Sequence, residues 1–481
     1  MVRRRRDIPA GSIGTARRGR HPNRALRRTV AVLLAFALGA AGALTGAATA
    51  SAAAPTATTS TSAAGAILPP DQDPFYVPPA GYAADPNGTV LRTRSIVGIY
   101  LAVPVLVNAY QVLYKSVDSH NQPVAEAATI LVPITPWTGG GQRPLVSYQL
   151  AEDSVATRCE PSYTLRVGLG APTPASTYEV SLSLPALAKG YAIVYADYEG
   201  PDSEFIAGPQ AAHSVLDGIR AAEHFPVTGL TPSTPVALWG YSGGGFATTW
   251  AGEVAPSYAP ELHIVGIAAG GVPADLKAMA NYNNGNIGAG LLILAFIGLD
   301  RAFPEAGIDG ILNASGKQLF DANSDNCTLD VALFHPFDNL ANYTTVSDPI
   351  DSPQAQYLYT ANDLGQHAPS APYYNYQALD DELVPVAQAD DLLVKYCSAG
   401  AVVQKSRIPL AEHILGEVDG ALPALQFISD RFAGKTRPER LRLDHRLILP
   451  TTSARPAATL PQLITNGGNV TVASDGTLTL R

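Results

Sequence analysis

The chain has 481 residues, of which 46% are hydrophobic, and it carries a formal net charge of −9 at pH 7. A chain of this length can bury a sizeable core, in one large domain or in two ordinary ones. Its acidic balance argues against nucleic acid and anionic lipid headgroups as partners, because like charges repel.

The first 52 residues have the pattern of a secretory signal peptide. Residues 1–28 contain ten arginines and one acid, an apolar run follows, and Ala50-Ser51-Ala52 gives an A-x-A cleavage pattern. Small residues weaken the run and no stop-transfer charges follow it, which disfavours a membrane anchor. We expect a secreted, extracellular protein cleaved near Ala52, with no integral membrane segment. Removing ten arginines and one acid would leave a net charge of −18.

Residues 53–70 are expected to be a low-complexity linker, since they contain few large apolar side chains. We expect the core to occupy residues 71–274 and 366–436. Short β-branched or aromatic runs predict strands at 128–134, 144–150, 191–197, 235–240, 263–270, 372–378 and 401–410. Amphipathic patterns predict helices over 176–190 and 211–225. This alternation predicts an α/β fold whose mostly parallel sheet is covered by helices on both faces.

The alternation breaks at residues 275–365, which we interpret as a cap or lid inserted between late strands. Its apolar segment 286–300 is a helix candidate too short to span a bilayer, and it could either line an acyl-binding site or simply pack. The tail, 437–481, has no pattern that suggests chemistry. Alternation around Asp475-Gly476 predicts a β-hairpin there.

The three cysteines, Cys159, Cys327 and Cys397, lack metal-ligand spacing. Export would permit one disulfide and leave one thiol over. Residues 321–327 begin like a calcium loop, but Asn326 stands where that loop requires glycine. We therefore expect no metal and no cofactor.

Ser242 lies in Gly240-Tyr241-Ser242-Gly243-Gly244, which fits the motif G-x-S-x-G. The motif alone is common, but here a buried-strand pattern precedes it and a helical pattern follows. That setting is typical of a nucleophile elbow, in which glycines allow a strained turn to present the serine. The alternative is a turn whose glycines only permit close packing.

A nucleophilic serine needs a general base, and in such folds the histidine follows the serine in the chain. His213 and His224 precede Ser242 and are interpreted as surface positions on a helix. His445 lies in a charge-rich tail segment, where a solvated position fits better. His413 lies between a predicted strand and a predicted helix, and it is the expected base.

The acid that orients the base should follow the predicted strand 372–378. Asp380, Asp381 and Glu382 are available there. Spacing does not separate Asp380 from Asp381, and one of them is expected to be a helix cap or a solvent-facing acid.

The oxyanion of the transition state needs two N–H donors. The backbone N–H of Gly243, directly after the nucleophile, is the first. The second is expected in the loop after the strand 144–150, but no motif in that loop identifies it.

The mature core resembles the secretory lipases of the lipase A type, a family known from yeasts and actinobacteria. The resemblance is carried by segments in one order along the chain: DPFYVPP, YQLAEDSVATRCEPSY, DYEGPDSEFIAG, LDGIRAAEHF, WGYSGGGFATTWA, APELHIVGIAAGGVP, DDELVP and PLAEHILGE.

This resemblance implies an α/β-hydrolase fold with a large helical cap. It implies a triad of Ser242, His413 and Asp381, and it assigns the second oxyanion donor to the backbone N–H of Asp153. It also implies a disulfide between Cys159 and Cys327. A partner for Cys397 is missing, so that thiol is expected to be free, and the tail beyond residue 436 departs from the family.

The expected function is therefore cleavage of carboxylic esters of fatty acids, as in a triacylglycerol lipase or carboxylesterase, through an acyl-enzyme. One alternative is a peptidase or amidase of the same fold, which would need a pocket for a charged or prolyl group. The other is a non-catalytic lipid-binding protein on a hydrolase scaffold, although such proteins usually lack a triad member.

Overall fold

The computed structural model describes residues 67–97, 99–100, 103–104, 107–172, 174–435, 470–472 and 478–480. The predicted signal peptide, most of the predicted linker and most of the predicted tail lie outside these ranges. The chain divides into two units, residues 1–443 and 444–481.

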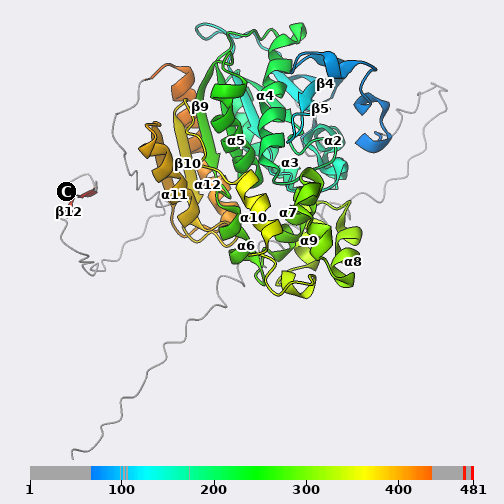
Figure 1. The fold of residues 1–481 in the computed structure, drawn as a ribbon. Helices are drawn as coiled ribbons and strands as arrows, with labels where there is room; N and C mark the ends of the chain where they lie inside the picture. Colours follow the sequence, from blue (N-terminus) through cyan, green and yellow to red (C-terminus); the bar gives the residue numbers. More distant parts are fainter. Residues whose placement is uncertain are drawn as a thin grey trace, which may run out of the picture. The chain divides into compact units, whose positions relative to one another are not determined.

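Nine strands of the first unit, within its described residues, form one sheet in the order β1-β4-β5-β7-β6-β8-β9-β10-β11 (Figure 1). They are β1 (Val90–Ile96), β4 (Val107–Val117), β5 (Pro123–Pro133), β6 (Leu145–Gln149), β7 (Ala192–Ala196), β8 (Val236–Tyr241), β9 (Ile264–Gly270), β10 (Tyr373–Ala378) and β11 (Val403–Ile408). The strands from β7 to β11 in this order run parallel, whereas β1, β4, β5 and β7 pair antiparallel. All seven predicted strands are confirmed.

Strands β1 and β4 were not predicted from the sequence, nor was the small hairpin of β2 (Ile99–Tyr100) and β3 (Val103–Pro104). The side chains of β1 are partly exposed along its whole length. It contains two arginines and therefore lacks the apolar run that marked the central strands.

Helices cover both faces of the sheet, as predicted. Residues of α4 (Gly208–His224) and α5 (Ser242–Tyr258) join one hydrophobic cluster, and residues of α3 (Pro174–Ala188) and α12 (His413–Phe432) join another. Neighbouring residues of β8 alternate between the two clusters: Leu238 belongs to the first and Trp239 to the second. A strand with both faces buried in this way reads as a continuous apolar run. The shorter helices α2 (Pro161–Val167) and α11 (Val386–Ser398) complete these layers.

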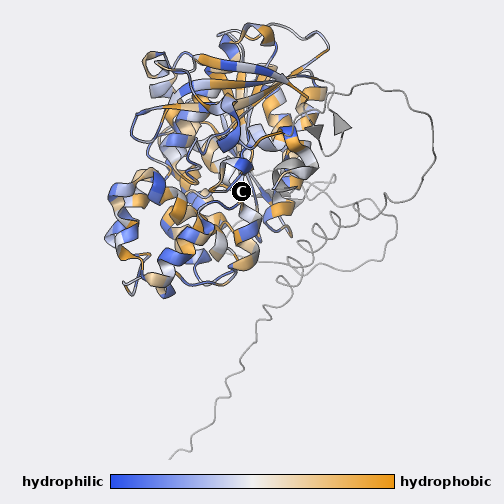
Figure 2. Ribbon diagram, turned by 90° about the vertical axis from the view of Figure 1, so that its right-hand side faces the viewer, coloured by the Kyte–Doolittle hydropathy of each residue, from blue (hydrophilic) through white to orange (hydrophobic). Residues whose placement is uncertain are grey.

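The segment between β9 and β10 is mainly helical. It contains α6 (Leu276–Asn283), α7 (Ala289–Ala302), α8 (Ala314–Asn323), α9 (Thr328–Phe334) and α10 (Pro353–Asn362). Figure 1 shows these helices gathered together beside one end of the sheet. In Figure 2 their ribbons mix hydrophilic and hydrophobic stretches, as expected of helices with one face on a core. Within the described residues no helix, α7 included, has the length and apolarity required to cross a membrane.

The second unit is described only at two short strands. β12 (Val470–Val472) pairs antiparallel with β13 (Leu478–Leu480). The two strands flank the Asp475-Gly476 dipeptide, which itself lies outside the described residues.

Candidate active site

Ser242 lies on a sharp turn where β8 passes into α5. Its φ angle is +54°, in the left-handed region that residues with side chains rarely adopt. A Cβ on Gly240 would lie 2.3 Å from the carbonyl oxygen of Gly244, and a Cβ on Gly244 would lie 2.1 Å from the carbonyl oxygen of Gln149. The turn can therefore form only because both positions are glycine. This strained strand–turn–helix geometry is that of a nucleophile elbow.

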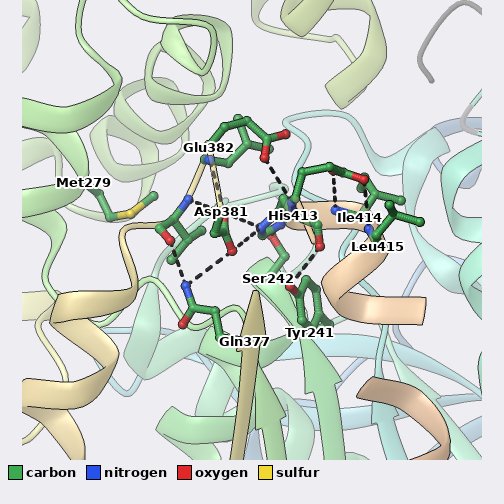
Figure 3. A network of polar contacts seen from close by, with 12 residues as sticks. Tyr241, Ser242, Met279, Gln377, Asp381, Glu382, His413, Ile414 and Leu415 are labelled. Atoms are coloured by element: carbon green, nitrogen blue, oxygen red, sulfur yellow. Dashed lines mark hydrogen bonds and ion pairs between the residues drawn. The ribbon is translucent and has the colours of Figure 1, made fainter. Parts of the chain in front are cut away.

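The imidazole of His413, at the first residue of α12, faces Ser242 (Figure 3). Its Nε2 lies 2.8 Å from the Oγ atom of Ser242. The backbone of His413 is held on both sides: its N–H donates to the Glu382 carboxylate at 3.0 Å, and its carbonyl accepts from the Tyr241 hydroxyl at 2.9 Å. The Glu412 side chain caps the helix that begins here. These contacts fix the ring against the serine.

The carboxylate of Asp381 lies on the other side of the imidazole. Both of its oxygens are 2.9 Å from the Nδ1 atom of His413. The same carboxylate accepts the N–H of Val384 at 2.8 Å and the side-chain amide of Gln377 at 3.3 Å. An acceptor at Nδ1 keeps the proton on that nitrogen and leaves Nε2 free to accept one. Asp380 is exposed, so Asp381 is the acid that the structure brings to the histidine.

The carboxylates around His413 stabilise the imidazolium that forms when Nε2 accepts a proton. Burial lowers the pKa of His413, but the carboxylate of Asp381, with those of Glu382 and Glu417, raises it more, to about 9. A site that stabilises imidazolium favours the transfer of a proton from the serine to the ring.

Two backbone N–H groups beside Ser242 have no acceptor among the residues that the structure describes. Gly243 lies in the first turn of α5, which has no side-chain cap, so its N–H is among the amides that a helix leaves unpaired. Asp153 has a φ of +44°, and no hydrogen bond within the described residues uses its N–H. A Cβ built on Gly243 would lie only 1.8 Å from the Oδ1 atom of Asp153, which makes the two residues immediate neighbours.

Residues 150–154, which we call the oxyanion loop, are held from several sides. The N–H of Ala151 donates to Glu179 at 2.8 Å, and the N–H of Ser154 donates to Glu199 at 3.2 Å. The Thr328 hydroxyl, at the start of α9, donates to the carbonyl of Glu152 at 2.8 Å. Among the described residues, these contacts leave the backbone N–H of Asp153 without an acceptor.

A disulfide between Cys159 and Cys327, with a Cα–Cα distance of 5.8 Å, ties the segment after the oxyanion loop to the start of α9. Cys397 is exposed and free. No group of three acids, histidines or cysteines that could hold a metal ion occurs among the described residues.

An apolar pocket adjoins Ser242 and Gly243. Its other lining residues are mostly aliphatic or aromatic: Asp153, Phe205, Ile206, Pro273, Leu276, Met279, Ala280, Asn283, Leu291, Leu292, Ala295, Phe296, Leu299, Tyr359, Leu383 and Val384. The apolar segment 286–300 both lines this pocket and packs into the core, whereas acyl binding by the pocket stays a prediction. Helix α7 lines the pocket with Leu291 and Ala295, and it packs into the core with Ile293 and Leu294.

Asp153 is the one carboxyl group in the described lining of this pocket. Burial raises its pKa to about 7, while the charge of His413 acts in the opposite direction. The Asp153 side chain therefore adds little negative charge to the site at acidic pH.

The expectation that His213 lies on the surface is wrong. The residue is 8% exposed, its ring stacks on Tyr258, and its Nδ1 lies 3.2 Å from the carbonyl oxygen of Asp118. Helix α4 is buried along almost its whole length, which the sequence did not indicate. His445 lies outside the described residues.

Comparisons with known proteins agree with this geometry. Residues 165–439 match the profile of a family described as secretory lipase. The chain is 35% identical over 375 residues to a protein of Mycobacterium tuberculosis named "probable inactive lipase", covering 76% of this chain and 83% of that protein. It is 32% identical over 386 residues to a secreted triacylglycerol lipase of Malassezia restricta, covering 76% of this chain and 80% of that protein.

The structure also resembles Candida antarctica lipase A, with a TM-score of 0.72 and 31% identity, covering 79% of this chain and 90% of that chain. With the sheet order described above, this likeness confirms the expected α/β-hydrolase fold.

Proposed function

The chain belongs to the secretory lipase family, and we propose that it is a catalytically active member that cleaves carboxylic esters of fatty acids. The observation that carries this proposal is the hydrogen-bonded series of Ser242, His413 and Asp381 beside an apolar pocket. A nucleophile, a base and an orienting acid in this order constitute the machinery of acyl transfer.

In the proposed reaction, the Oγ atom of Ser242 attacks the ester carbonyl carbon while Nε2 of His413 accepts the hydroxyl proton. The N–H groups of Gly243 and Asp153 donate to the oxyanion that forms. His413 then returns the proton to the leaving alcohol, and an acyl-enzyme remains. Water attacks the acyl-enzyme with His413 again as base, and the fatty acid is released.

The pocket supports an acyl chain as the substrate group. Its aliphatic and aromatic lining offers apolar contact along a chain, and Asp153 and His413 are the charged or chargeable side chains beside the nucleophile. A peptidase selecting a basic side chain would need an ionised acid in its pocket, and burial keeps Asp153 largely neutral at acidic pH. Triacylglycerol, the substrate named for the Malassezia relative, is the ester we propose.

The name of the Mycobacterium relative raises the question of whether this chain is also inactive. Inactivity in a serine hydrolase usually follows from loss of a triad member. Here the Ser242 Oγ atom lies 2.8 Å from His413, and His413 contacts both oxygens of Asp381. This unbroken series supports activity.

The same proposal covers export and the cap. Residues 1–52 would direct secretion and be removed near Ala52, in keeping with relatives named as secreted. Residues 275–365 would act as a cap over the core formed by 71–274 and 366–436. The mass of the secreted protein's N-terminal peptide tests the cleavage site.

Hydrolysis of p-nitrophenyl esters from acetyl to palmitoyl tests the activity, with the wild type, Ser242→Ala and Ser257→Ala measured in parallel. Ser257 lies exposed near the end of the same helix, so its variant controls for the substitution. We expect Ser242→Ala to lose about three or more orders of magnitude in kcat, and Ser257→Ala to keep its activity. Equal rates for wild type and Ser242→Ala would refute Ser242 as nucleophile. No hydrolysis by the wild type would favour the peptidase or the lipid-binding alternative.

A further inference from the structure

A buried pair of carboxyl groups connects the two halves of the candidate site. Glu179 lies on α3 and Glu417 on α12, and the two residues are 3% and 4% exposed. The two carboxyl groups act on each other electrostatically, and the Oε1 atom of each is buried and has no hydrogen-bond partner among the described residues. Because carboxylates only accept hydrogen bonds, a bond between the two groups requires a proton on one of them.

Each member of the pair also has a contact that reaches the site. Glu179 accepts the N–H of Ala151 at 2.8 Å, two residues before Asp153 in the oxyanion loop. Glu417 lies one helical turn after His413, on the same face of α12. The Tyr178 hydroxyl donates to Glu417, which anchors α3 to α12 a second time. The pair is thus a direct connection between the loop that carries a proposed oxyanion donor and the helix that carries the base.

We propose that the Glu179–Glu417 pair is a positioning element that keeps the oxyanion loop in register with His413, and that it does so only while it holds a shared proton. This inference rests on the proposed function, since it assigns a second layer of residues to the same reaction. Neither glutamate lines the pocket, so neither would touch the substrate.

Burial keeps the pair protonated over a wide pH range. It raises the pKa of Glu417 to about 7, and burial together with the charges of Glu417 and Asp153 raises the pKa of Glu179 well above its usual range. Among the described residues, the titratable groups that interact with the pair are Tyr148, Asp153, Tyr178, Tyr195, Tyr198, Tyr241, Tyr376 and His413. Of these only His413 can be positive. Loss of the last proton at alkaline pH would therefore place two carboxylates against each other without a counter-ion, and they would separate.

The test compares Glu417→Ala, Glu417→Gln and Glu160→Ala with the wild type. Glu417→Gln retains a hydrogen bond to Glu179 without a proton that can be lost. Glu160 forms another buried carboxyl pair, with Asp197, and no hydrogen bond among the described residues joins that pair to the oxyanion loop. Glu160→Ala therefore controls for the loss of a buried carboxyl pair. Active sites are counted with a fluorophosphonate that labels the nucleophilic serine, and kcat and KM are measured on p-nitrophenyl butyrate from pH 5 to 10.

We expect Glu417→Ala to lower kcat per labelled site about 10- to 100-fold with little change in KM, since misplacing a donor by 1 Å costs about that much. Glu417→Gln should restore kcat at neutral pH and move the alkaline limb of its pH profile to higher pH. Glu160→Ala should lose thermal stability but keep its kcat. Wild-type turnover by Glu417→Ala, or an alkaline limb unmoved in Glu417→Gln, would overturn the proposal.

Hydrogen exchange at the Ala151 amide separates this proposal from the proposed function. It should be faster in Glu417→Ala and unchanged in Glu417→Gln, whether or not the protein hydrolyses esters. A wild type that is neither labelled nor active would refute the proposed function alone, and the exchange rates would then decide on the pair. Should Glu417→Ala fail to fold, the pH profile and exchange rate of Glu417→Gln still decide.

Discussion

Gly243→Ala tests the arrangement of the two proposed oxyanion donors most directly. The new Cβ would start 1.8 Å from Asp153 Oδ1, whereas real Cβ atoms essentially never approach a neighbour closer than 3.0 Å. The Asp153 side chain must therefore shift by about 1.2 Å, and because it is 7% exposed it has little room to rotate away. The shift is expected to carry the backbone of Asp153, and with it one donor, out of place.

Loss of one oxyanion donor costs about 100- to 1,000-fold in kcat, or about 3–4 kcal/mol of transition-state stabilisation. We expect Gly243→Ala to fall in this range, with KM nearly unchanged, when kcat on p-nitrophenyl butyrate is divided by the concentration of labelled sites. Gly310→Ala is the matched control, because a Cβ there meets nothing within 4 Å.

The double variant Gly243→Ala/Asp153→Gly separates the clash from other effects. Glycine at position 153 removes the clashing oxygen, keeps the backbone N–H and accepts the positive φ of that position. We expect it to recover most of the lost kcat. Wild-type kcat in Gly243→Ala, or no recovery in the double variant, would refute the assignment of the Asp153 N–H as a donor.

Three further predictions follow from the site. Asp381→Asn should lower kcat about 10⁴-fold. It should also move the acidic limb of the kcat/KM profile to lower pH, because the carboxylate that raises the pKa of His413 is removed. An acidic limb at the wild-type pH would contradict this prediction. The folded protein should lose stability as pH rises from about 4 to about 7, because folding holds a proton on Asp153 up to pH about 7 that the unfolded chain releases near 3.8. For Asp153 alone the whole change is on the order of 4 kcal/mol, of which about 3 kcal/mol falls between pH 5 and pH 8. Calorimetry at these two pH values measures that part, and a higher melting temperature at pH 8 contradicts the prediction. Ala295→Trp should fill the pocket, lower the rate of palmitoyl ester hydrolysis at least about tenfold and leave butyryl ester hydrolysis unchanged. An equal loss of rate on both esters argues against acyl-chain binding in this pocket.

The turn around Ser242 could be predicted from the sequence because its determinants lie within a few residues of each other. A buried strand, a helix start and glycines at positions 240 and 244 allow one local geometry, and the structure has it, with Ser242 at a φ of +54°. The central parallel strands were equally accessible, since burial on both faces gives each a continuous apolar run. Strand β1, which is partly exposed, gives no such signal.

The order of residues along the chain restricted the general base to His413 or His445. The spacing of residues did not show whether Asp380 or Asp381 orients that base. The two aspartates differ only in the folded protein, where the turn after β10 directs the Asp381 carboxylate to His413 Nδ1 and leaves Asp380 in solvent. The family resemblance named Asp381, whereas the residues alone did not.

Other features depend on segments that are far apart in the chain and meet only on folding. Glu382 supports the backbone of His413, 31 positions later, and Glu179 supports the oxyanion loop and pairs with Glu417 across 238 positions. No local pattern distinguishes such an acid from one that faces solvent, because its role depends on burial and on a partner from another element. The sequence by itself thus determined the nucleophile turn and the central strands, through local sterics and hydrophobic periodicity. Only the tertiary structure decided which acids are buried, which partners they contact and which amides are left free beside Ser242.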